Sequence, residues 1–442
     1  MRLAWFLTLF MLLPSAVQAQ PVRALKTIHQ TQQLRASVLP ANSGWQRVYL
    51  MSVEARQGDL LVIDSQVQFT IDSAEQVGQQ FRLTVNGKPV GTRVIQVNEQ
   101  PGSHHLPMRA MGLFKVPKDG TYEVSSEGSA FHSGGDFPVT IDHADNLSYG
   151  NLLVEHYHLY TSRDDARNAY WLQRYLQGPP PLERVYGQTP YQQEAISTLG
   201  ARAGPDELWR VSGQALGVAR NGMEMLAGVL TNQAAAISPY GGENVLEGNL
   251  FAPLQFEAVV EPQAGPQNLE FRVYGGFGHG FALYPGSNYF DLLVFGQQPS
   301  YALSSWATAV AIDCPAIASN QPLQELVGRD LFLAAGELVR LRGNVQFARP
   351  ETDGAVTAEC QMRLAISDGQ SGVERHFQKN LTPRKVVLPL SGTLSFQAPR
   401  AGTYRLSLKA SGFCPEGAVR LRLDAEQTQL QLLHYQKDSS PS

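Results

Sequence analysis

Residues 106–131, LPMRAMGLFKVPKDGTYEVSSEGSAF, decide the fold because the same pattern returns near the end of the chain. Residues 388–413 read LPLSGTLSFQAPRAGTYRLSLKASGF, and the two stretches align without a gap at an offset of 388 − 106 = 282, with ten of 26 positions identical. In each stretch a proline, Pro117 or Pro399, precedes a Gly-Thr-Tyr run, which is typical of a turn that leads into a strand. An internal repeat therefore organises this sequence.

Further matches flank this pair in the same order. Val67-Gln68-Phe69 matches Val345-Gln346-Phe347 at an offset of 278, and residues 152–157 (LLVEHY) match residues 430–435 (LQLLHY). Matches that keep one order over so long a distance are hard to obtain by chance, so we predict that the first and last thirds are copies of one domain.

A fainter third copy lies between them. Residues 207–213 (ELWRVSG) parallel residues 337–343 (ELVRLRG), and residues 289–294 (YFDLLV) parallel residues 149–154 (YGNLLV) at an offset of 140. We therefore predict a divergent middle copy.

The pattern within a copy is that of β-strands. Tyr404, Leu406 and Leu408 alternate with polar residues, and this period of two places one face in a core and the other in water. Several such strands in about 130 residues predict a sandwich of two sheets. The predicted fold is all-β, with tandem β-sandwich domains of jelly-roll or immunoglobulin-like type joined by a short helical connector.

The run F-x-x-P-x-x-G-T-Y, at residues 114–122 and 396–404, resembles the accessory β-sandwich modules of secreted bacterial proteins, the pre-peptidase C-terminal type among them. The resemblance covers only this strand, turn and strand. It implies a module that binds, spaces or stabilises and does not itself cleave a substrate.

The predicted boundaries follow from these repeats and from punctuation by Gly and Pro. Residues 163–200 start with a helix-like pattern that ends before three prolines, and residues 220–250 are rich in Ala and Gly and favour a helical or loop insertion. The expected segments are a signal peptide (1–19), β-sandwich repeat 1 (20–162), a helix and Pro-rich connector (163–200), divergent repeat 2 (201–300), repeat 3 (301–437) and a tail (438–442).

Charge and hydropathy limit the partners. The 442 residues carry a net charge of −4, which argues against binding to nucleic acid phosphates. Arg2, the apolar run 3–13 and small residues before Gln20 predict a cleaved secretory signal, and no later run is long and apolar enough to cross a membrane. We expect a periplasmic or extracellular protein.

Three cysteines lie in the last third of the chain. In an oxidising compartment two of them can pair. We predict a disulfide between Cys360 and Cys414, because both fall at strand edges in the repeat, and a free Cys314.

Candidate metal ligands are sparse. His156 and His158 lie two residues apart, which places both imidazoles on one face of a strand. Together with Gly150 they resemble the opening of the first metal motif of cupins, but no acid follows at the expected spacing, and two histidines do not complete a metal shell. A His and Tyr pair at the end of the strand, packed against the connector, is the favoured interpretation, and no cofactor is expected.

Aromatic residues gather in two segments, 157–191 and 274–290. Exposed aromatic rings stack on sugars or anchor protein interfaces, and packing between domains is the alternative explanation. The candidate binding residues are Tyr157, Tyr160, Trp171, Tyr175, Tyr274, Phe277 and Tyr284.

The sequence contains no recognisable catalytic motif, since no G-x-S-x-G elbow occurs and the glycine-rich run 275–280 lacks the features of a phosphate loop. We therefore expect a non-catalytic modular binding or structural protein, with carbohydrate or a cell-surface protein as partner. The alternatives are a carbohydrate-active enzyme with a catalytic middle domain, marked by paired carboxylates in an open cleft, and a subunit of a cell-surface assembly.

Overall fold

A computed structural model describes the chain in strands and the turns that join them. The described residues are 25–73, 77–97, 102–131, 138–142, 150–157, 169–175, 186, 188–205, 207–219, 224–233, 235–238, 241–245, 251–276, 280–284, 287–295, 301–306, 311–317, 323–348, 357–381 and 387–435. These ranges contain no helix, so the all-β prediction is confirmed for them. They accordingly include no apolar helix of membrane-spanning length. The predicted signal peptide and tail lie outside them.

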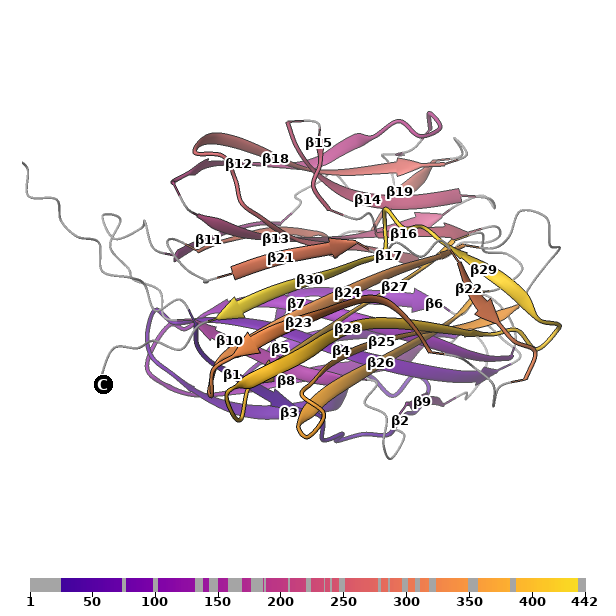
Figure 1. Ribbon diagram of the computed structural model, residues 1–442, viewed down its shortest axis with the longest axis horizontal. Coiled ribbons are helices and arrows are strands. Elements are labelled where there is room, and N and C mark those ends of the chain that lie inside the picture. The colour runs from indigo at the N-terminus through magenta and orange to yellow at the C-terminus, as the bar shows by residue number, and fades with distance from the viewer. Residues whose placement is uncertain are drawn as a thin grey trace, which may run out of the picture.

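The first sandwich contains two sheets (Figure 1). The inner sheet is the one that faces the other two sandwiches, and the outer sheet is the one that faces away from them. The inner sheet has the order β1(Leu25–Thr31)-β10(Asn151–Tyr157)-β4(Leu60–Ser73)-β9(Val139–Ile141)-β2(Val38–Leu39), with β7(Gly102–Lys115) also paired to β4. The outer sheet has the order β3(Gln46–Ala55)-β8(Gly120–Phe131)-β5(Gly78–Val85)-β6(Lys88–Val97).

The middle sandwich has the same plan. Its inner sheet has the order β11(Ala169–Tyr175)-β20(Tyr289–Phe295)-β13(Leu208–Ala219)-β17(Phe251–Val260), with β19(Phe281–Leu283) also paired to β13. Its outer sheet has the order β12(Glu194–Ala203)-β18(Gly265–Gly275)-β14(Glu224–Asn232)-β15(Ala235–Ala236), with β16(Gly241–Val245) also paired to β14.

The last sandwich repeats the first strand by strand. Its inner sheet has the order β21(Tyr301–Trp306)-β30(Gln429–Tyr435)-β24(Leu338–Ala348)-β29(Val419–Leu423)-β22(Ala311–Cys314), with β27(Val387–Gln397) also paired to β24. Its outer sheet has the order β23(Gln324–Leu333)-β28(Gly402–Phe413)-β25(Ala358–Ser367)-β26(Gly372–Leu381).

Strand registers show how the three copies correspond. The central inner strands β4, β13 and β24 start at Leu60, Leu208 and Leu338, and these residues occupy equivalent positions. Leu60 lies opposite Tyr157 and Leu208 lies opposite Phe295, so β10 and β20 correspond at 295 − 157 = 138. The middle copy is therefore present, but the offset of 140 predicted for these strands is wrong by two residues. Two strands with the same alternation can be aligned in either register, and only the pairing partner decides between them.

Two expected exceptions to the β pattern are wrong. Residues 169–175, predicted within a helical connector, form β11 and pair along their whole length with β20. The segment AYWLQRY is rich in aromatic residues, which favour strands, and pairing with a neighbouring strand outweighs a weak helical pattern. Likewise, the segment 220–250 contributes β14, β15 and β16.

These pairings bear on the boundaries of the middle unit. β11 ends before residue 201 and belongs to the inner sheet of the middle sandwich, and β12, which belongs to the outer sheet, begins seven residues before it, at Glu194. We propose that this unit begins before the predicted boundary, and that residues 169–175 and 188–200 belong to it.

The repeated Gly-Thr-Tyr run is explained by what its tyrosine does. Tyr122 donates a hydrogen bond from Oη to the carbonyl of Lys118 at 2.6 Å, and Tyr404 donates one to the carbonyl of Arg400 at 3.0 Å. In both copies the bond spans four residues and closes the turn before the strand, as in the tyrosine corner of other β-sandwiches.

The middle copy keeps this bond with a different residue. The pairing of β12 with β18 places Gln267 at the tyrosine position, because Gly265 corresponds to Gly120 and Gly402. Gln267 Nε2 donates to the carbonyl of Gln263 at 2.7 Å, again four residues upstream. The local geometry is therefore retained although the sequence motif is lost.

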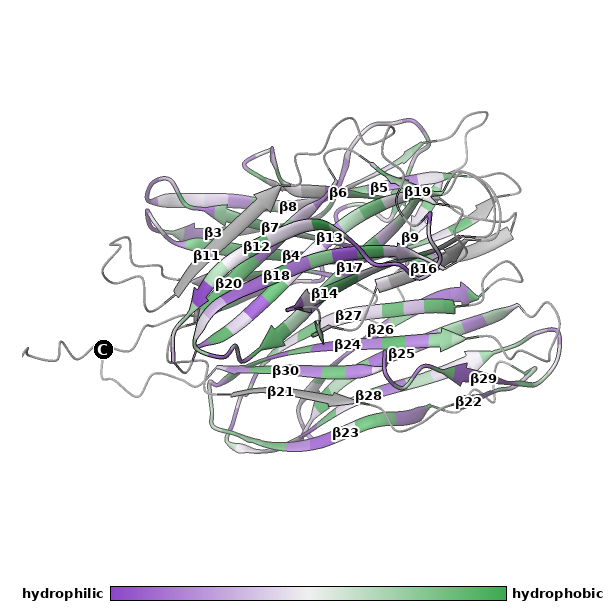
Figure 2. Ribbon diagram, turned by 90° about the horizontal axis from the view of Figure 1, so that it is seen from above, coloured by the Kyte–Doolittle hydropathy of each residue, from purple (hydrophilic) through white to green (hydrophobic). Residues whose placement is uncertain are grey.

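Each sandwich encloses its own apolar interior, as the alternation of apolar and polar residues along the strands predicts (Figure 2). The strands of all three run roughly along the longest axis of the molecule (Figure 1). The units also close on one another in a cycle, because β6 contacts β17, β16 contacts β27, and β26 contacts β7. Strands β6, β16 and β26 occupy equivalent positions in the three copies, and so do β7, β17 and β27. Each contact thus joins the first position of one copy to the second position of the next, so the three sandwiches are arranged with approximate threefold symmetry.

Candidate functional site

The face of the inner sheets that points away from the sandwich interiors forms a shared junction between the three units. On β4 the side chains of Leu61 and Ile63 point into the interior, so the alternate residues Leu60, Val62 and Asp64 face the other way. All three are buried, which requires that another protein surface covers them. The equivalent positions are Leu208, Arg210 and Ser212 on β13 and Leu338, Arg340 and Arg342 on β24.

One end of the junction is apolar. Leu60 of the first sandwich packs there with Leu208 and Leu293 of the middle sandwich. Leu433 and the partly buried Leu338 of the last sandwich belong to the same cluster. Tyr157 and Tyr435 belong to this cluster. Tyr157 donates a hydrogen bond to the Glu155 carboxylate at 2.6 Å, and its hydroxyl lies 3.0 Å from that of Tyr435. These contacts join the first and last sandwiches directly.

Next along the strands lies a layer of buried ion pairs. Glu257 of the middle sandwich is contacted by arginines from all three units: Arg210 Nε at 3.1 Å, Arg109 Nη2 at 2.8 Å and Arg340 Nη1. Each of these four side chains is at most 5% exposed. A single carboxylate thus links the three copies.

Two further carboxylates complete the layer. Asp64 accepts two hydrogen bonds from Arg109, at 2.9 and 2.6 Å, and one from Arg340 at 3.0 Å. Glu155 accepts a hydrogen bond from Arg210 Nη1 at 2.6 Å and lies 2.7 Å from Arg340 Nε. Bidentate and shared pairing of this kind is the geometry that arginine supplies and lysine does not.

The pairing determines the ionisation of these groups. Burial by itself would raise the pKa of the Glu257 carboxyl, but Arg210, Arg340 and Arg109 together hold it well below its ordinary value. Burial alone would also raise the pKa of the Asp64 carboxyl, but Arg109 lowers it. Glu257 and Asp64 therefore stay charged at neutral pH, and neither of these two carboxyls can act as a general acid.

Arg342 lies at the margin of this layer. Its Nη1 is 3.7 Å from Glu257 Oε2, and its Nε and Nη1 make no hydrogen bond to the described residues. Burial lowers the pKa of Arg342 to about 9. Of the arginines in the layer, this one is held least firmly.

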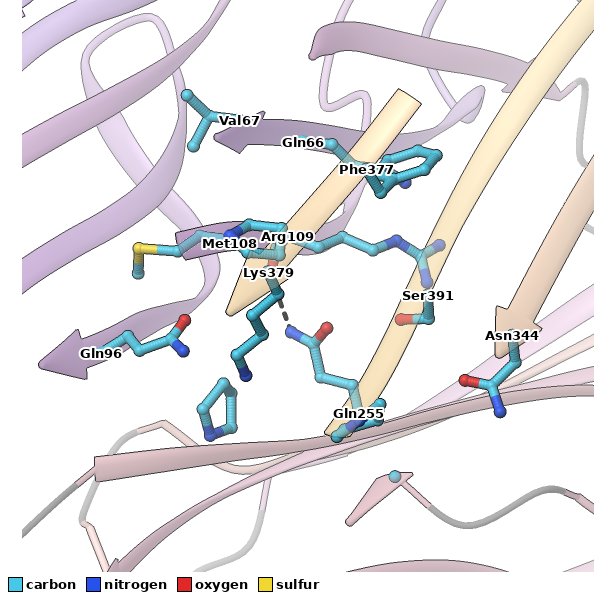
Figure 3. Close-up of a pocket in the computed structure, with 14 residues that line it drawn as sticks. Gln66, Val67, Gln96, Met108, Arg109, Gln255, Asn344, Phe377, Lys379 and Ser391 are labelled. Atoms are coloured by element: carbon cyan, nitrogen blue, oxygen red, sulfur yellow. Dashed lines mark hydrogen bonds between the residues drawn. The ribbon is translucent and has the colours of Figure 1, made fainter. Parts of the chain in front are cut away.

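Beyond the ion pairs the junction becomes polar and contains a cavity of about 70 Å³ (Figure 3). Its wall is built from equivalent positions of the three copies, because Pro107, Pro253 and Pro389 lie at matching places on β7, β17 and β27. The next equivalent set differs in chemistry, being Arg109, Gln255 and Ser391. The remaining lining residues are Gln66, Val67, Gln96, Met108, Gly241, Asn344, Phe377 and Lys379.

The candidate aromatic residues do not come together at one site. Tyr157 is fully buried in the junction, so its assignment to an exposed binding surface is wrong, and it packs between domains. Tyr284 is half-buried, with Arg93 of the first sandwich bonded to its hydroxyl at 2.8 Å. Tyr157 and Tyr284 were candidates because aromatic rings favour interfaces, and in this structure the interface is the one between the sandwiches.

The other candidates have separate positions. Tyr274 is half-buried on β18, and burial raises its pKa to about 12, with smaller contributions from Asp424 and Tyr191. Trp171 and Tyr175 lie on β11, opposite Leu293 and Tyr289 of β20. Tyr160 and Phe277 lie outside the described residues.

His156, one of the two weak metal candidates, is buried and lies 2.6 Å from Asp59 through its Nε2. The last copy repeats this pair, with His434 Nε2 3.0 Å from Glu337. His158 lies outside the described residues, which contain no group of three or more candidate metal ligands. A repeated histidine-acid pair at the start of the central strand is a structural feature of the domain.

The disulfide joins Cys314 to Cys414, with 5.6 Å between their Cα atoms, so the predicted pairing of Cys360 with Cys414 is wrong. Cys360 is a buried free thiol on β25, opposite Gly412 of β28, and burial raises its pKa above the ordinary range. The strand that carries Cys314, β22, instead lies beside β29 near the end of β28. Spacing along the chain does not show which cysteines become neighbours in space.

The junction residues themselves were missed by the sequence analysis. The signal was present, because the parallel runs ELWRVSG and ELVRLRG place Arg210 and Arg340 at the same position of otherwise apolar strands. An arginine repeated on a central strand indicates that the face it occupies is buried against a partner.

Comparison with known proteins does not place the chain in a family. No family model matches it, and no curated protein does. Among solved structures, it is similar to the N-terminal tandem CBM22-1–CBM22-2 domain of Xyn10C from Paenibacillus barcinonensis, at 11% identity and a TM-score of 0.18. The match covers 60% of this chain and 93% of that one. A likeness at this level carries no argument about function.

Proposed function

We propose that this chain is a secreted or periplasmic, non-catalytic binding or structural protein, in which three β-sandwiches form one packed body. One observation carries the proposal: the inner sheets of all three units are buried against each other through an ion-pair layer. Partners therefore have access to the outer sheets and the loops. The secretory signal predicted at residues 1–19 supports the location.

The carboxylates of the middle unit argue against the catalytic alternative. A glycosidase needs a pair of carboxyl groups in an open cleft, one of them with a raised pKa. Glu257 is buried, bonded to three arginines and has a lowered pKa. Asp291 on β20, which pairs with the other side of β13, is also buried. Glu257 instead joins the three units.

The partner that we propose is a carbohydrate or a cell-surface protein, in line with the likeness of the Gly-Thr-Tyr run to accessory modules. Tyr191 is 65% exposed, its backbone N–H donates to Gly275 at 2.8 Å, and it lies close enough to Tyr274 to influence the pKa of that residue. Two neighbouring tyrosines, one exposed, supply a surface on which a sugar ring stacks.

A glycan array with the mature protein tests this proposal. We expect bound glycans on the wild type and at least a tenfold loss of affinity in Tyr191→Ala. Phe332→Ala is the matched control, because Phe332 is also 65% exposed but lies on another sandwich. Turnover of a polymer by the pure protein, or equal losses in both variants, would contradict the proposal.

An assembly subunit is the second candidate, and one observation favours it. β23 is an edge strand of the last outer sheet, and it carries the exposed Phe332 beside the half-buried Leu331. An unpaired edge with an exposed aromatic residue is suited to pairing with another chain. Light scattering would show an oligomer that Phe332→Ala dissociates and Tyr191→Ala leaves intact, whereas a monomeric wild type would contradict this candidate.

A further inference from the structure

The outer sheets of the three copies differ at one central position of the face that points away from the sandwich interior. At this position β5, β14 and β25 carry Arg82, Val229 and Arg363, and the strand beside each carries Glu127, Arg272 and Lys409 opposite them. In the first copy the two residues form an ion pair, with Arg82 Nη2 2.7 Å from Glu127 Oε2. In the last copy both residues are cations. The scaffold therefore folds around either arrangement, and the two facing cations belong to the last copy alone.

These two cations lie side by side on the outside of the last sandwich. Arg363 alternates along β25 with Met362 and Leu364, which belong to the interior, so its side chain faces away from it. Lys409 on β28 is directly opposite Arg363, which places their Cβ atoms about 5 Å apart. Like charges in this position repel each other, so the pair favours an arrangement in which an anion lies against both.

The protein itself neutralises this pair only in part. Lys409 makes no hydrogen bond or ion pair with the residues that the structure describes, and Arg363 Nε is buried without a hydrogen-bond partner among them. Arg363 Nη1 is 3.7 Å from Glu374 Oε2, which is beyond hydrogen-bond distance. The other oxygen of Glu374 lies 2.9 Å from Nε2 of His376, whose pKa is lowered by burial below its ordinary value of 6.5. Two cations thus share one carboxylate that is already bonded to a third group.

The acids at the margins of this face have other partners. Glu325 and Asp330 on β23 both pair with Arg405. Glu359 on β25 accepts a hydrogen bond from the Gln361 amide at 3.1 Å. The positive charge at the centre of the face is therefore left for a ligand.

The surroundings of the two cations indicate what kind of anion fits. Arg363 is 24% exposed and Lys409 is half-buried, so both can be reached from solvent. One step along the same strands Gln361 lies directly opposite Gln378, and both face outward as Arg363 does. A guanidinium and an ammonium bind a carboxylate through charge-assisted hydrogen bonds, and amide groups both donate to and accept from sugar hydroxyls.

We propose that Arg363 and Lys409 bind the carboxylate of an acidic saccharide, of the uronic acid class, on the outer sheet of the last sandwich. This rests on the proposed function, since it takes the partner to be a carbohydrate. It adds the class of sugar and a site separate from Tyr191.

Isothermal titration calorimetry of the mature protein with alginate oligomers, which are chains of uronic acids, tests the proposal. We expect saturable binding that weakens as sodium chloride is raised. Lys409→Glu should weaken binding at least tenfold, while its melting temperature stays at or above that of the wild type, because it recreates the ion pair of the first copy. Lys409→Gln, which adds no acid, should also weaken binding. Lys88→Glu makes the same change of charge at an exposed lysine of the first sandwich and should leave binding unchanged.

Neutral and peptidic probes separate this site from the glycan surface at Tyr191. Tyr191→Ala should leave alginate binding unchanged, and Lys409→Glu should leave the binding of neutral glycans unchanged. Polyglutamate should bind several-fold more weakly than alginate. If neutral glycans bind but alginate does not, the acidic site is wrong and the proposed function stands, whereas no binding of either contradicts both. Unchanged alginate binding in Lys409→Glu, or polyglutamate binding as tight as alginate binding, would also overturn the proposal.

Discussion

The interior of each sandwich and the ion-pair layer in the junction between the sandwiches are equally buried but chemically opposite. The interior of the last sandwich is held by apolar residues such as Leu341, Leu364 and Leu408. The junction joins Glu257 to arginines of three copies. Apolar packing is tolerant of partner and orientation, whereas a buried charge must meet its counter-charge in one geometry. We infer that the interiors supply most of the stability and that the junction fixes how the three copies dock.

Removing the shared carboxylate should have the largest effect. In Glu257→Gln three buried arginines lose a negative partner, and an uncompensated buried charge costs about 3–5 kcal/mol. Equilibrium unfolding in urea measures the loss. Glu261→Gln, which alters an exposed glutamate just beyond the same strand, should stay within about 0.5 kcal/mol of the wild type. Similar free energies of unfolding for Glu257→Gln and Glu261→Gln would contradict the role given to the ion-pair layer.

Acid should weaken the junction before it weakens the interiors. The folded pKa values of Glu257 and Asp64 lie below their ordinary values of 4.5 and 3.8, so the unfolded chain binds protons more readily. The stability that they contribute is complete above about pH 5 and is lost as the pH falls toward the folded pKa values. Urea midpoints measured from pH 7 downward should fall less steeply in Glu257→Gln. If the urea midpoints of the wild type and of Glu257→Gln fall in parallel with pH, Glu257 is not responsible for the loss of stability in acid.

Conservative substitutions sharpen the contrast. Arg340→Lys keeps the charge but cannot reproduce contacts to Asp64, Glu155 and Glu257, so we expect a loss of about 2 kcal/mol or more. Leu364→Met in the interior keeps volume and polarity and should cost less than about 1.5 kcal/mol. Both follow from urea unfolding under one set of conditions. The reverse order would mean that the junction is the more tolerant region.

The smallest expected effect concerns the turn bond that the copies share. Tyr404→Phe removes the hydrogen bond to Arg400 and should cost about 1 kcal/mol. Gln267→Asn in the middle copy shortens the donor that bonds to Gln263 and should cost a similar amount. Thermal unfolding of both variants measures the losses. A neutral Tyr404→Phe would mean that the ring packing against Phe396 suffices.

The repeat and its alternation were enough to predict the sandwich class, because side chains that alternate in a strand record which face is buried. They were not enough for Trp171, where a helical pattern was overridden by pairing with β20. They also misplaced Cys360 and the buried Tyr157. These errors share a cause, since each depends on a neighbour that is distant in the sequence.

What the amino-acid sequence determined by itself is the local plan: strands, the turn before the Gly-Thr-Tyr run, and one apolar interior in each copy. These features depend on residues within one domain. The tertiary structure alone decided that the second face of each inner sheet is buried, that Arg210 and Arg340 meet Glu257, and that a polar cavity forms among three equivalent prolines. Those features arise from contacts between copies, and the charge of a residue does not reveal which distant residue will neutralise it.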